Sequence, residues 1–190
     1  MSAAEERIQE ALAGFDFGAP VVGALRYGQG HINDTFVVHT QPEDRCCRRF
    51  ILQRMSAAAF KHPDELMENI IGVTEYLGRE IEKHGGDRDR EAMRVLRPRN
   101  GQPFFTDSDG GAWRVYPFVE RTVCYQSAES AELFAASGRA FGRFQRLLGG
   151  YPAQTLHETI PNFHNTEDRL AKFKAALAAD PLGRAKDCGP

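Results

Sequence analysis

Residues 21–39 read V-V-G-A-L-R-Y-G-Q-G-H-I-N-D-T-F-V-V-H, which is two apolar runs joined by a short turn with two glycines. The runs Val21–Tyr27 and Thr35–His39 are typical of strands, so the segment predicts a strand-turn-strand unit. A dinucleotide-binding turn leads into a helix and carries a third glycine, whereas Asn33 stands at that position here. Backbone amides of such a turn can approach phosphate oxygens. The alternative is a hairpin turn that binds no ligand.

The flanking segments extend this unit to an α+β fold. The expected elements are, in order, helix Ala3–Phe15, strands Val21–Tyr27, Thr35–His39 and Phe50–Arg54, a helix from Pro63 to Gly85, strands Met93–Leu96 and Ala112–Phe118, and helices Ala128–Leu148 and Asn165–Asp180. The polar stretch Gln41–Arg48 predicts a hairpin connection. Because the links between strands are short, we expect a five-stranded antiparallel sheet with one long helix, followed by further helices.

Composition limits the classes of partner. The 190 residues carry 24 Lys and Arg against 26 Asp and Glu, so the formal charge of −2 predicts no nucleic-acid or anionic-membrane partner. No run approaches the roughly 18 apolar residues of a membrane span, and Met1–Gln9 has no apolar segment of a secretory signal. The cysteines, Cys46, Cys47, Cys124 and Cys188, show neither a disulfide framework nor zinc spacing, so a reduced, cytoplasmic protein is expected.

Gln53 and Arg54 end the third strand. A basic residue there, paired with Glu65 or Glu68 of the following helix, would hold nucleotide phosphates in a kinase. Because successive strand residues point to opposite faces, only one of Gln53 and Arg54 can face the phosphates, and the sequence leaves the choice open. The alternative is a surface Arg54 and a solvated glutamate.

Residues 113–120 read W-R-V-Y-P-F-V-E, a strand that changes character at Pro117. This pattern suits a connector between two lobes, whose free backbone groups could bind the edge of an adenine. The alternative is an edge strand that stops at a proline.

His62–Asn69 matches the spacing of a kinase catalytic loop, but it precedes the connector and lies in a helix, so we reject it. His157 and His164 lack a third ligand, and no metal cluster is expected.

Taken in order, these segments resemble the small lobe of a protein-kinase-like fold and the start of its large lobe. Four stretches are similar to the N-acetylhexosamine 1-kinases of the aminoglycoside phosphotransferase and choline kinase superfamily: G-Q-G-H-I-N-D-T-F at 28–36, F-I-L-Q-R at 50–54, M-E-N-I at 67–70 and I-P-N-F-H-N-T at 160–166. The resemblance runs from about Gly23 to the end of the chain. It implies phosphorylation of the anomeric hydroxyl of GlcNAc or GalNAc, with ATP and Mg²⁺.

The resemblance also implies site residues. The glycine turn would cover the phosphates, the end of the third strand would contact them with a helix glutamate as its partner, and the connector would form the hinge. The residues concerned are Gly28, Gln29, Gly30, His31, Asn33, Asp34, Thr35, Gln53 or Arg54, Glu68, Tyr116, Pro117, Phe118 and Val119.

By the same resemblance, residues 1–119 are a nucleotide-binding lobe and residues 120–190 are part of a helical lobe. In this superfamily the catalytic Asp and the metal-binding Asn and Asp follow these helices, and no residue of this sequence matches them. We therefore expect an N-terminal portion with no catalytic or metal-binding residue and little activity by itself. The apolar stripes Leu133–Leu148 and Leu170–Leu177 would lack partner helices and could support self-association.

Two other functions fit the same residues. A non-catalytic nucleotide-binding or regulatory half-kinase would bind ATP through Gly28–Asn33. An interaction module on the same fold would bind no nucleotide and would tolerate Gly30→Val. Aminoglycosides, choline and homoserine stay open as acceptors in place of a sugar, because the fold alone does not decide among them.

Overall fold

The computed structural model of the protein describes residues 2–28, 30, 32–41, 48–125 and 127–185. The chain forms two compact units, Met1–Thr159 and Ile160–Pro190. Gln29, His31 and most of the expected connection between residues 41 and 48 lie outside the described residues. The lobe boundary expected between residues 119 and 120 stays a prediction.

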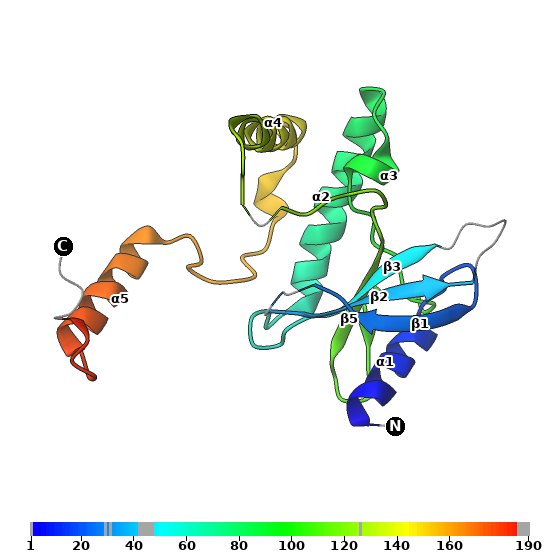
Figure 1. The fold of residues 1–190 in the computed structure, drawn as a ribbon, viewed down its shortest axis with the longest axis horizontal. Helices are drawn as coiled ribbons and strands as arrows, with labels where there is room; N and C mark the ends of the chain where they lie inside the picture. Colours follow the sequence, from blue (N-terminus) through cyan, green and yellow to red (C-terminus); the bar gives the residue numbers. More distant parts are fainter. Residues whose placement is uncertain (1, 29, 31, 42–47, 126, 186–190) are drawn as a thin grey trace. The chain divides into compact units, whose positions relative to one another are not determined.

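Five antiparallel strands form one sheet in the first unit, in the order β1-β2-β3-β5-β4 (Figure 1). Their bounds are Val21–Arg26 (β1), Asp34–Thr40 (β2), Arg49–Arg54 (β3), Phe105–Thr106 (β4) and Ala112–Pro117 (β5). Side chains alternate between the two faces, and Val38, Leu52 and Val115 are fully buried on one of them. The expected α+β fold with a five-stranded antiparallel sheet is therefore confirmed.

Helix α1 (Ala3–Gly14) packs against this buried face. Ser2 starts the helix with a capping box, in which its hydroxyl accepts from the Glu5 N–H at 3.3 Å and its own N–H donates to the Glu5 carboxylate at 2.7 Å. Leu12 and, just after the helix, Phe15 join the sheet residues in the main hydrophobic cluster. Burial of apolar surface, at about 25 cal/mol per Å², fastens the helix to the sheet.

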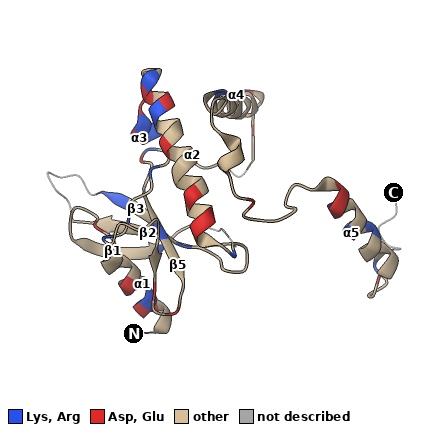
Figure 2. Ribbon diagram, turned by 180° about the vertical axis from the view of Figure 1, so that it is seen from behind, with Lys and Arg blue, Asp and Glu red and all other residues tan. Residues whose placement is uncertain are grey.

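The long helix α2 (Pro63–Lys83) begins and ends as its sequence predicts. Pro63 stands at the start, where a missing N–H costs no hydrogen bond, and Gly85 follows the end with φ 73°. Met67 is buried in a second hydrophobic cluster that includes Ala112 of β5. Acidic residues recur along the length of the helix (Figure 2).

One expected strand is wrong. Met93–Leu96 forms no strand, and only its last residue bridges to β5, with the N–H donating to Val115 O at 2.8 Å. A continued ladder would place Pro98 opposite Trp113, and a proline has no N–H to donate. Strand β4 takes this place and pairs with Trp113.

Further helices complete the two units. A one-turn helix, α3 (Arg88–Glu91), lies between α2 and β4, and a 3₁₀ turn, η1 (Ala153–Thr155), follows α4 (Ala131–Leu147). Helix α4 begins at Ala131 rather than at the expected residue 128, because the Ser130 hydroxyl caps it by accepting from the Leu133 N–H at 3.2 Å. In the second unit, Asn165 caps α5 (Thr166–Ala179), as the sequence predicts. None of the described helices is both long and apolar enough to cross a lipid bilayer.

Candidate functional site

Three polar side chains form a row across the sheet face opposite α1. Thr35, Gln53 and Arg114 are cross-strand neighbours on β2, β3 and β5. Gln53 Nε2 donates to Thr35 Oγ1 at 2.9 Å, and Arg114 Nε and Nη2 donate to Gln53 Oε1 at 2.9 and 2.6 Å. Burial lowers the pKa of the Arg114 guanidinium, but an arginine in a protein stays charged. The row therefore places one positive charge on this face.

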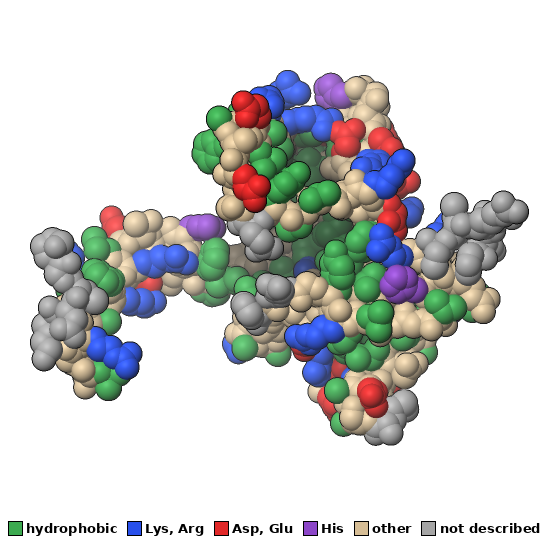
Figure 3. Space-filling view, in the orientation of Figure 1, with side chains coloured by type: hydrophobic (Ala, Val, Ile, Leu, Met, Phe, Trp, Pro, Cys, Tyr) green, Lys and Arg blue, Asp and Glu red, His purple; other side chains and the backbone are tan. Residues whose placement is uncertain are grey.

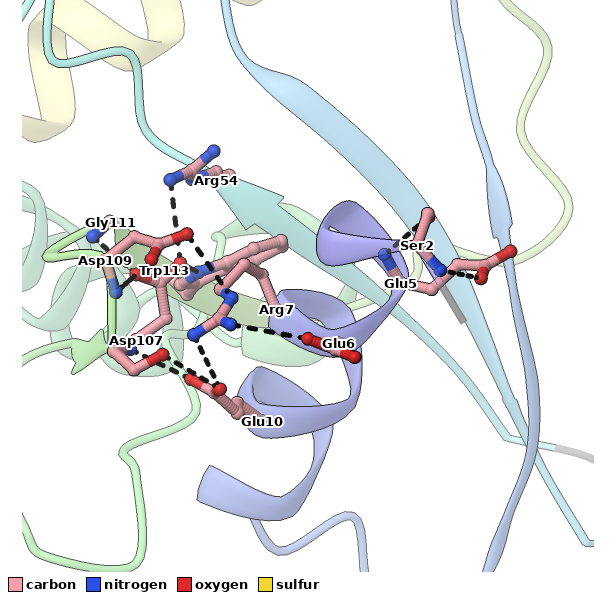
Figure 4. A network of polar contacts seen from close by, with 11 residues as sticks. Ser2, Glu5, Glu6, Arg7, Glu10, Arg54, Asp107, Asp109, Gly111 and Trp113 are labelled. Atoms are coloured by element: carbon pink, nitrogen blue, oxygen red, sulfur yellow. Dashed lines mark hydrogen bonds and ion pairs between the residues drawn. The ribbon is translucent and has the colours of Figure 1, made fainter.

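Arg54 lies on the other face, so the structure separates the two residues between which the sequence left a choice. The Arg54 guanidinium lies 3.7 Å from the Asp107 carboxylate and 5.9 Å from the centre of the Trp113 ring (Figure 4). Asp107 in turn accepts from Trp113 Nε1 and from the Gly111 N–H, both at 2.7 Å. Gln53 is thus the end residue of β3 that shares a face with Thr35.

The glycine turn is fixed at both ends by hydrogen bonds. Gly28 adopts φ 77°, a left-handed conformation that glycine reaches without strain, and the Tyr27 N–H donates to Thr35 O at 2.8 Å. Asn33, at the position of the third glycine of a dinucleotide-binding turn, does not adopt positive φ. Its Oδ1 instead accepts from the Ser56 N–H at 2.9 Å, which ties the turn to the segment after β3.

Two further expected residues of the turn are also described. The Asp34 carboxylate forms an ion pair with Arg26 at 2.9 Å, so its charge is balanced locally. A Cβ atom built on Gly30 would meet no heavy atom within 4 Å. The described residues therefore leave open space beside the Gly30 backbone, which a ligand can approach.

Glu68 is not brought to the end of β3. Its Oε2 lies 2.8 Å from His157 Nε2, and the neighbouring Asn69 exchanges two hydrogen bonds of 2.9 Å with the backbone of His157. Within the described part of the chain, Glu68 forms no contact with Gln53 or Arg54. The physical reason is that Gln53 carries no charge to attract a carboxylate and already bonds both of its row neighbours.

The connector after β5 continues along the same face as the row. Tyr116 pairs with Ile51, and burial raises the pKa of the Tyr116 hydroxyl despite the nearby Arg114 charge. The Phe118 N–H donates to Arg49 O at 3.0 Å and is thereby engaged in the sheet. Pro117 has no N–H, and the Val119 N–H donates to no acceptor in the described residues. Val119 thus offers the connector's available donor.

An apolar floor lies between the connector and the glycine turn. Val37 and Ile51 are cross-strand partners and are 7% and 6% exposed, yet they belong neither to the cluster with α1 nor to the cluster with α2. Tyr27 and Phe118 fall on this face by alternation, and their rings meet edge to face at 5.6 Å. These two aromatic rings give a planar ring a surface on which to stack.

A cavity of about 800 Å³ borders the connector. Residues 116–120, the first residues of β3 and residues 89–94 line it. On its wall, the Arg49 guanidinium stacks 4.0 Å from the centre of the Phe118 ring and forms an ion pair with Glu120. The hydrogen bond from Arg49 lowers the pKa of the Glu120 carboxyl. The volume falls in the range of small-molecule sites.

The described residues contain no group of three or more His, Cys, Asp or Glu side chains placed to hold a metal ion. No model of a known protein family matches the chain.

Sequence reasoning missed Arg114 and Tyr27 as members of the site. The alternation in W-R-V-Y places Arg114 on the face of Tyr116, but only the register of β3 against β5 shows that it meets Gln53.

Proposed function

We propose that this chain supplies the ATP-binding part of a phosphotransferase that acts on the anomeric hydroxyl of an N-acetylhexosamine. The observation that carries the proposal is the row of Thr35, Gln53 and Arg114 beside the glycine turn. It supports a phosphate site because a guanidinium and amide N–H groups are the donors that phosphate oxygens accept from. Arg114 uses Nε and Nη2 on Gln53, which leaves the donors of Nη1 for a phosphate.

The adenine would stack against the exposed side of the Tyr27 or Phe118 ring, and the Val119 N–H would donate to a ring nitrogen. The open space at Gly30 would admit the phosphates. These residues fit a nucleotide in size and in donor chemistry. Mg²⁺ would enter with ATP, because the described residues gather no acidic cluster to hold it beforehand.

The choice of acceptor rests on the resemblance of residues 28–36, 50–54, 67–70 and 160–166 to the N-acetylhexosamine 1-kinases. This choice is tested by measuring ADP release in a preparation that has kinase activity. Release with GlcNAc or GalNAc is compared with release with an aminoglycoside, choline and homoserine. Saturable ATP binding without ADP release from any acceptor would favour the non-catalytic nucleotide-binding function instead.

Calorimetric titration with ATP, with and without Mg²⁺, tests the nucleotide site through the two end residues of β3. Gln53→Glu keeps the side-chain shape and the bond to Arg114, but it removes the Nε2 donor and adds a charge that repels phosphate. We expect the dissociation constant to rise more than about tenfold, which is about 1.4 kcal/mol. Arg54→Gln is the matched control on the opposite face and should leave ATP affinity unchanged. No saturable binding by the wild-type protein, or equal losses in both variants, would contradict the proposal.

Gly30→Val is the second variant for the same titration. Because a Cβ at Gly30 meets no atom within 4 Å, the valine should not disturb the unliganded fold. It should still obstruct the close approach of phosphates to the backbone and weaken ATP binding more than about tenfold. Gly142→Val on α4, where a Cβ is equally free, is the control. An unchanged affinity in Gly30→Val would contradict a phosphate site beside Gly30, whereas a wild-type protein that binds no ATP would favour the interaction module.

A further inference from the structure

A second cavity, of about 440 Å³, lies where β3 ends, away from the row of Thr35, Gln53 and Arg114. The glycine turn, the segment between β3 and α2 and the turn before β5 form its walls. Its lining residues include two cations, Arg54 and Lys61, and the apolar side chains of Ile32 and Phe60. The proposed nucleotide site does not use this space, because Arg54 lies on the opposite face from Gln53.

Two cations of this cavity form no ion pair shorter than 3.7 Å in the described residues. Arg54 forms one ion pair in the described residues, at 3.7 Å with Asp107, and its side chain is 37% exposed. Lys61 Nζ donates to Ala57 O at 3.1 Å and forms no ion pair with a carboxylate among the described residues. Both could form shorter, charge-assisted hydrogen bonds with an anionic ligand.

The acidic residues near the cavity are already balanced. Asp34 lines it, but Arg26 neutralises this carboxylate at 2.9 Å. Asp107 accepts from Trp113, Gly111 and the Asp109 N–H at 2.7, 2.7 and 3.0 Å, so its charge is stabilised without Arg54. A ligand could therefore draw Arg54 away while Asp107 keeps its hydrogen bonds.

The rest of the wall is apolar. Ile32 and Phe60 face the same space as the two cations, together with Met55 and Pro63. Ile32 is 62% exposed and adds accessible apolar surface to this wall. Convergent cations beside an apolar wall are typical of sites for small organic anions.

We infer that this cavity binds an organic anion, an apolar body that carries one phosphate or carboxylate group, with Arg54 and Lys61 as its charged contacts. The inference goes beyond the proposed nucleotide site and does not depend on it. Trp113, the single tryptophan of the chain, provides a natural reporter. Its ring lies 5.9 Å from the Arg54 guanidinium, and its Nε1 bonds Asp107, so movement of Arg54 changes its surroundings.

Titration of the full chain with phenyl phosphate, and separately with benzoate, followed by Trp113 fluorescence and calorimetry, tests the inference. At least one of the two anions should bind saturably, and phenol, the neutral counterpart, should not. Arg54→Gln and Lys61→Gln should each weaken binding by about tenfold, the loss of one charge-assisted hydrogen bond. Arg139→Gln on the exposed surface of α4 removes the same charge and should leave binding unchanged.

Lys61 is exposed, so its variant should keep the fold even if Arg54→Gln does not. Failure of both anions to saturate, binding of phenol with equal affinity, or full affinity in Lys61→Gln would overturn the inference. Binding that is lost in Gln53→Glu but kept in Arg54→Gln and Lys61→Gln would place the anion on the nucleotide face and would equally overturn it. The ATP affinity of Lys61→Gln is measured as well. If it is unchanged while anion binding is weakened, the anion site and the proposed nucleotide site are separate.

Discussion

The Asp107 carboxylate holds the turn between β4 and β5 together. Its side chain is fully enclosed and accepts hydrogen bonds from the Trp113 ring and from the backbone N–H groups of Gly111 and Asp109 (Figure 4). Burial by itself raises the pKa of this carboxyl, but the hydrogen bonds from Trp113 and Gly111 and the charge of Arg54 outweigh burial and lower it. The folded protein therefore favours the ionised form.

Asp107→Asn should destabilise the protein in a pH-dependent manner. The amide keeps the shape but replaces one acceptor with a donor that faces other donors, so we expect the free energy of unfolding at pH 7 to fall by about 2 kcal/mol. Because the folded-state pKa lies below the unfolded value of about 3.9, the wild-type contribution is present above that pH and is lost as the pH falls through the folded-state pKa. Urea unfolding of both proteins at pH 7 and in acid measures the difference, which should shrink in acid.

The control for this prediction is Asp109→Asn, two residues along the same turn. The Asp109 side chain is 58% exposed and pairs with Arg7 at 3.3 Å. Its substitution should change stability by less than about 1 kcal/mol, as for other surface pairs. A difference between wild type and Asp107→Asn that stays constant down to acid pH would show that the carboxylate charge contributes nothing.

At this scale, the sequence predicts which residue types end β3 but not which of them meets the site. Alternation places Gln53 and Arg54 on opposite faces, yet the face of each depends on the pairing of β3 with β2 and β5. Arg114 was missed for the same reason, since it lies 61 residues from Gln53 in the sequence and meets it only through register. The contact of Glu68 with His157 is equally hidden from the sequence, because the two residues are 89 positions apart.

At the scale of elements, α1 and β4 meet at a glycine. A Cβ on Gly14, the last residue of α1, would lie 2.5 Å from the Phe105 ring of β4. Phe105 cannot move freely, because it packs against the main hydrophobic cluster with its ring centre 6.3 Å from that of Phe15. The absence of a side chain at Gly14 thus lets the helix end approach the short edge strand.

Gly14→Ala should therefore lower the free energy of unfolding by about 1–3 kcal/mol, the usual cost of overpacking, although alanine favours a helix. Gly138→Ala in the interior of α4 is the matched control, since a Cβ there meets nothing within 4 Å. It should stabilise α4 by about 0.5–1 kcal/mol through helix propensity alone. Thermal unfolding of the two variants compares them, and a stabilised Gly14→Ala would contradict the close packing of Phe105.

The elements also show where sequence patterns suffice. Helix α2 is predicted correctly because its apolar stripe, Pro63 and Gly85 are all local signals. The fourth expected strand is not, because Met93–Leu96 has a strand-like composition but Pro98 prevents its ladder from continuing. Phe105–Thr106, with two residues, is too short to carry a period and becomes a strand only through its pairing with β5.

At the scale of the first unit, α2 connects the sheet to the segment that follows α4. Met67 of α2 lies in the second hydrophobic cluster, which includes Ala112 of β5. Asn69, on the same helix as Met67, forms two hydrogen bonds with the backbone of His157. Farther along α2, Tyr76 meets Tyr151 edge to face at 5.3 Å. Helix α2 therefore contacts the second hydrophobic cluster with some of its residues and the segment 151–157 with others.

Helix α4 presents large apolar side chains to solvent (Figure 3). Phe134, Phe141 and Phe144 are 73%, 67% and 45% exposed, and Phe134 and Phe141 share one side of the helix because they are two turns apart. Exposed apolar surface of this kind favours association, so we expect the protein to bind a hydrophobic dye and to self-associate as its concentration rises. Sedimentation velocity over a concentration series measures the association.

The double variant Phe134→Glu/Phe141→Glu should bind less dye and stay monomeric. Arg139→Glu changes the net charge equally on the same helix and should behave like wild type. A wild-type protein that sediments as one species at every concentration and binds no dye would mean that the α4 surface mediates no association.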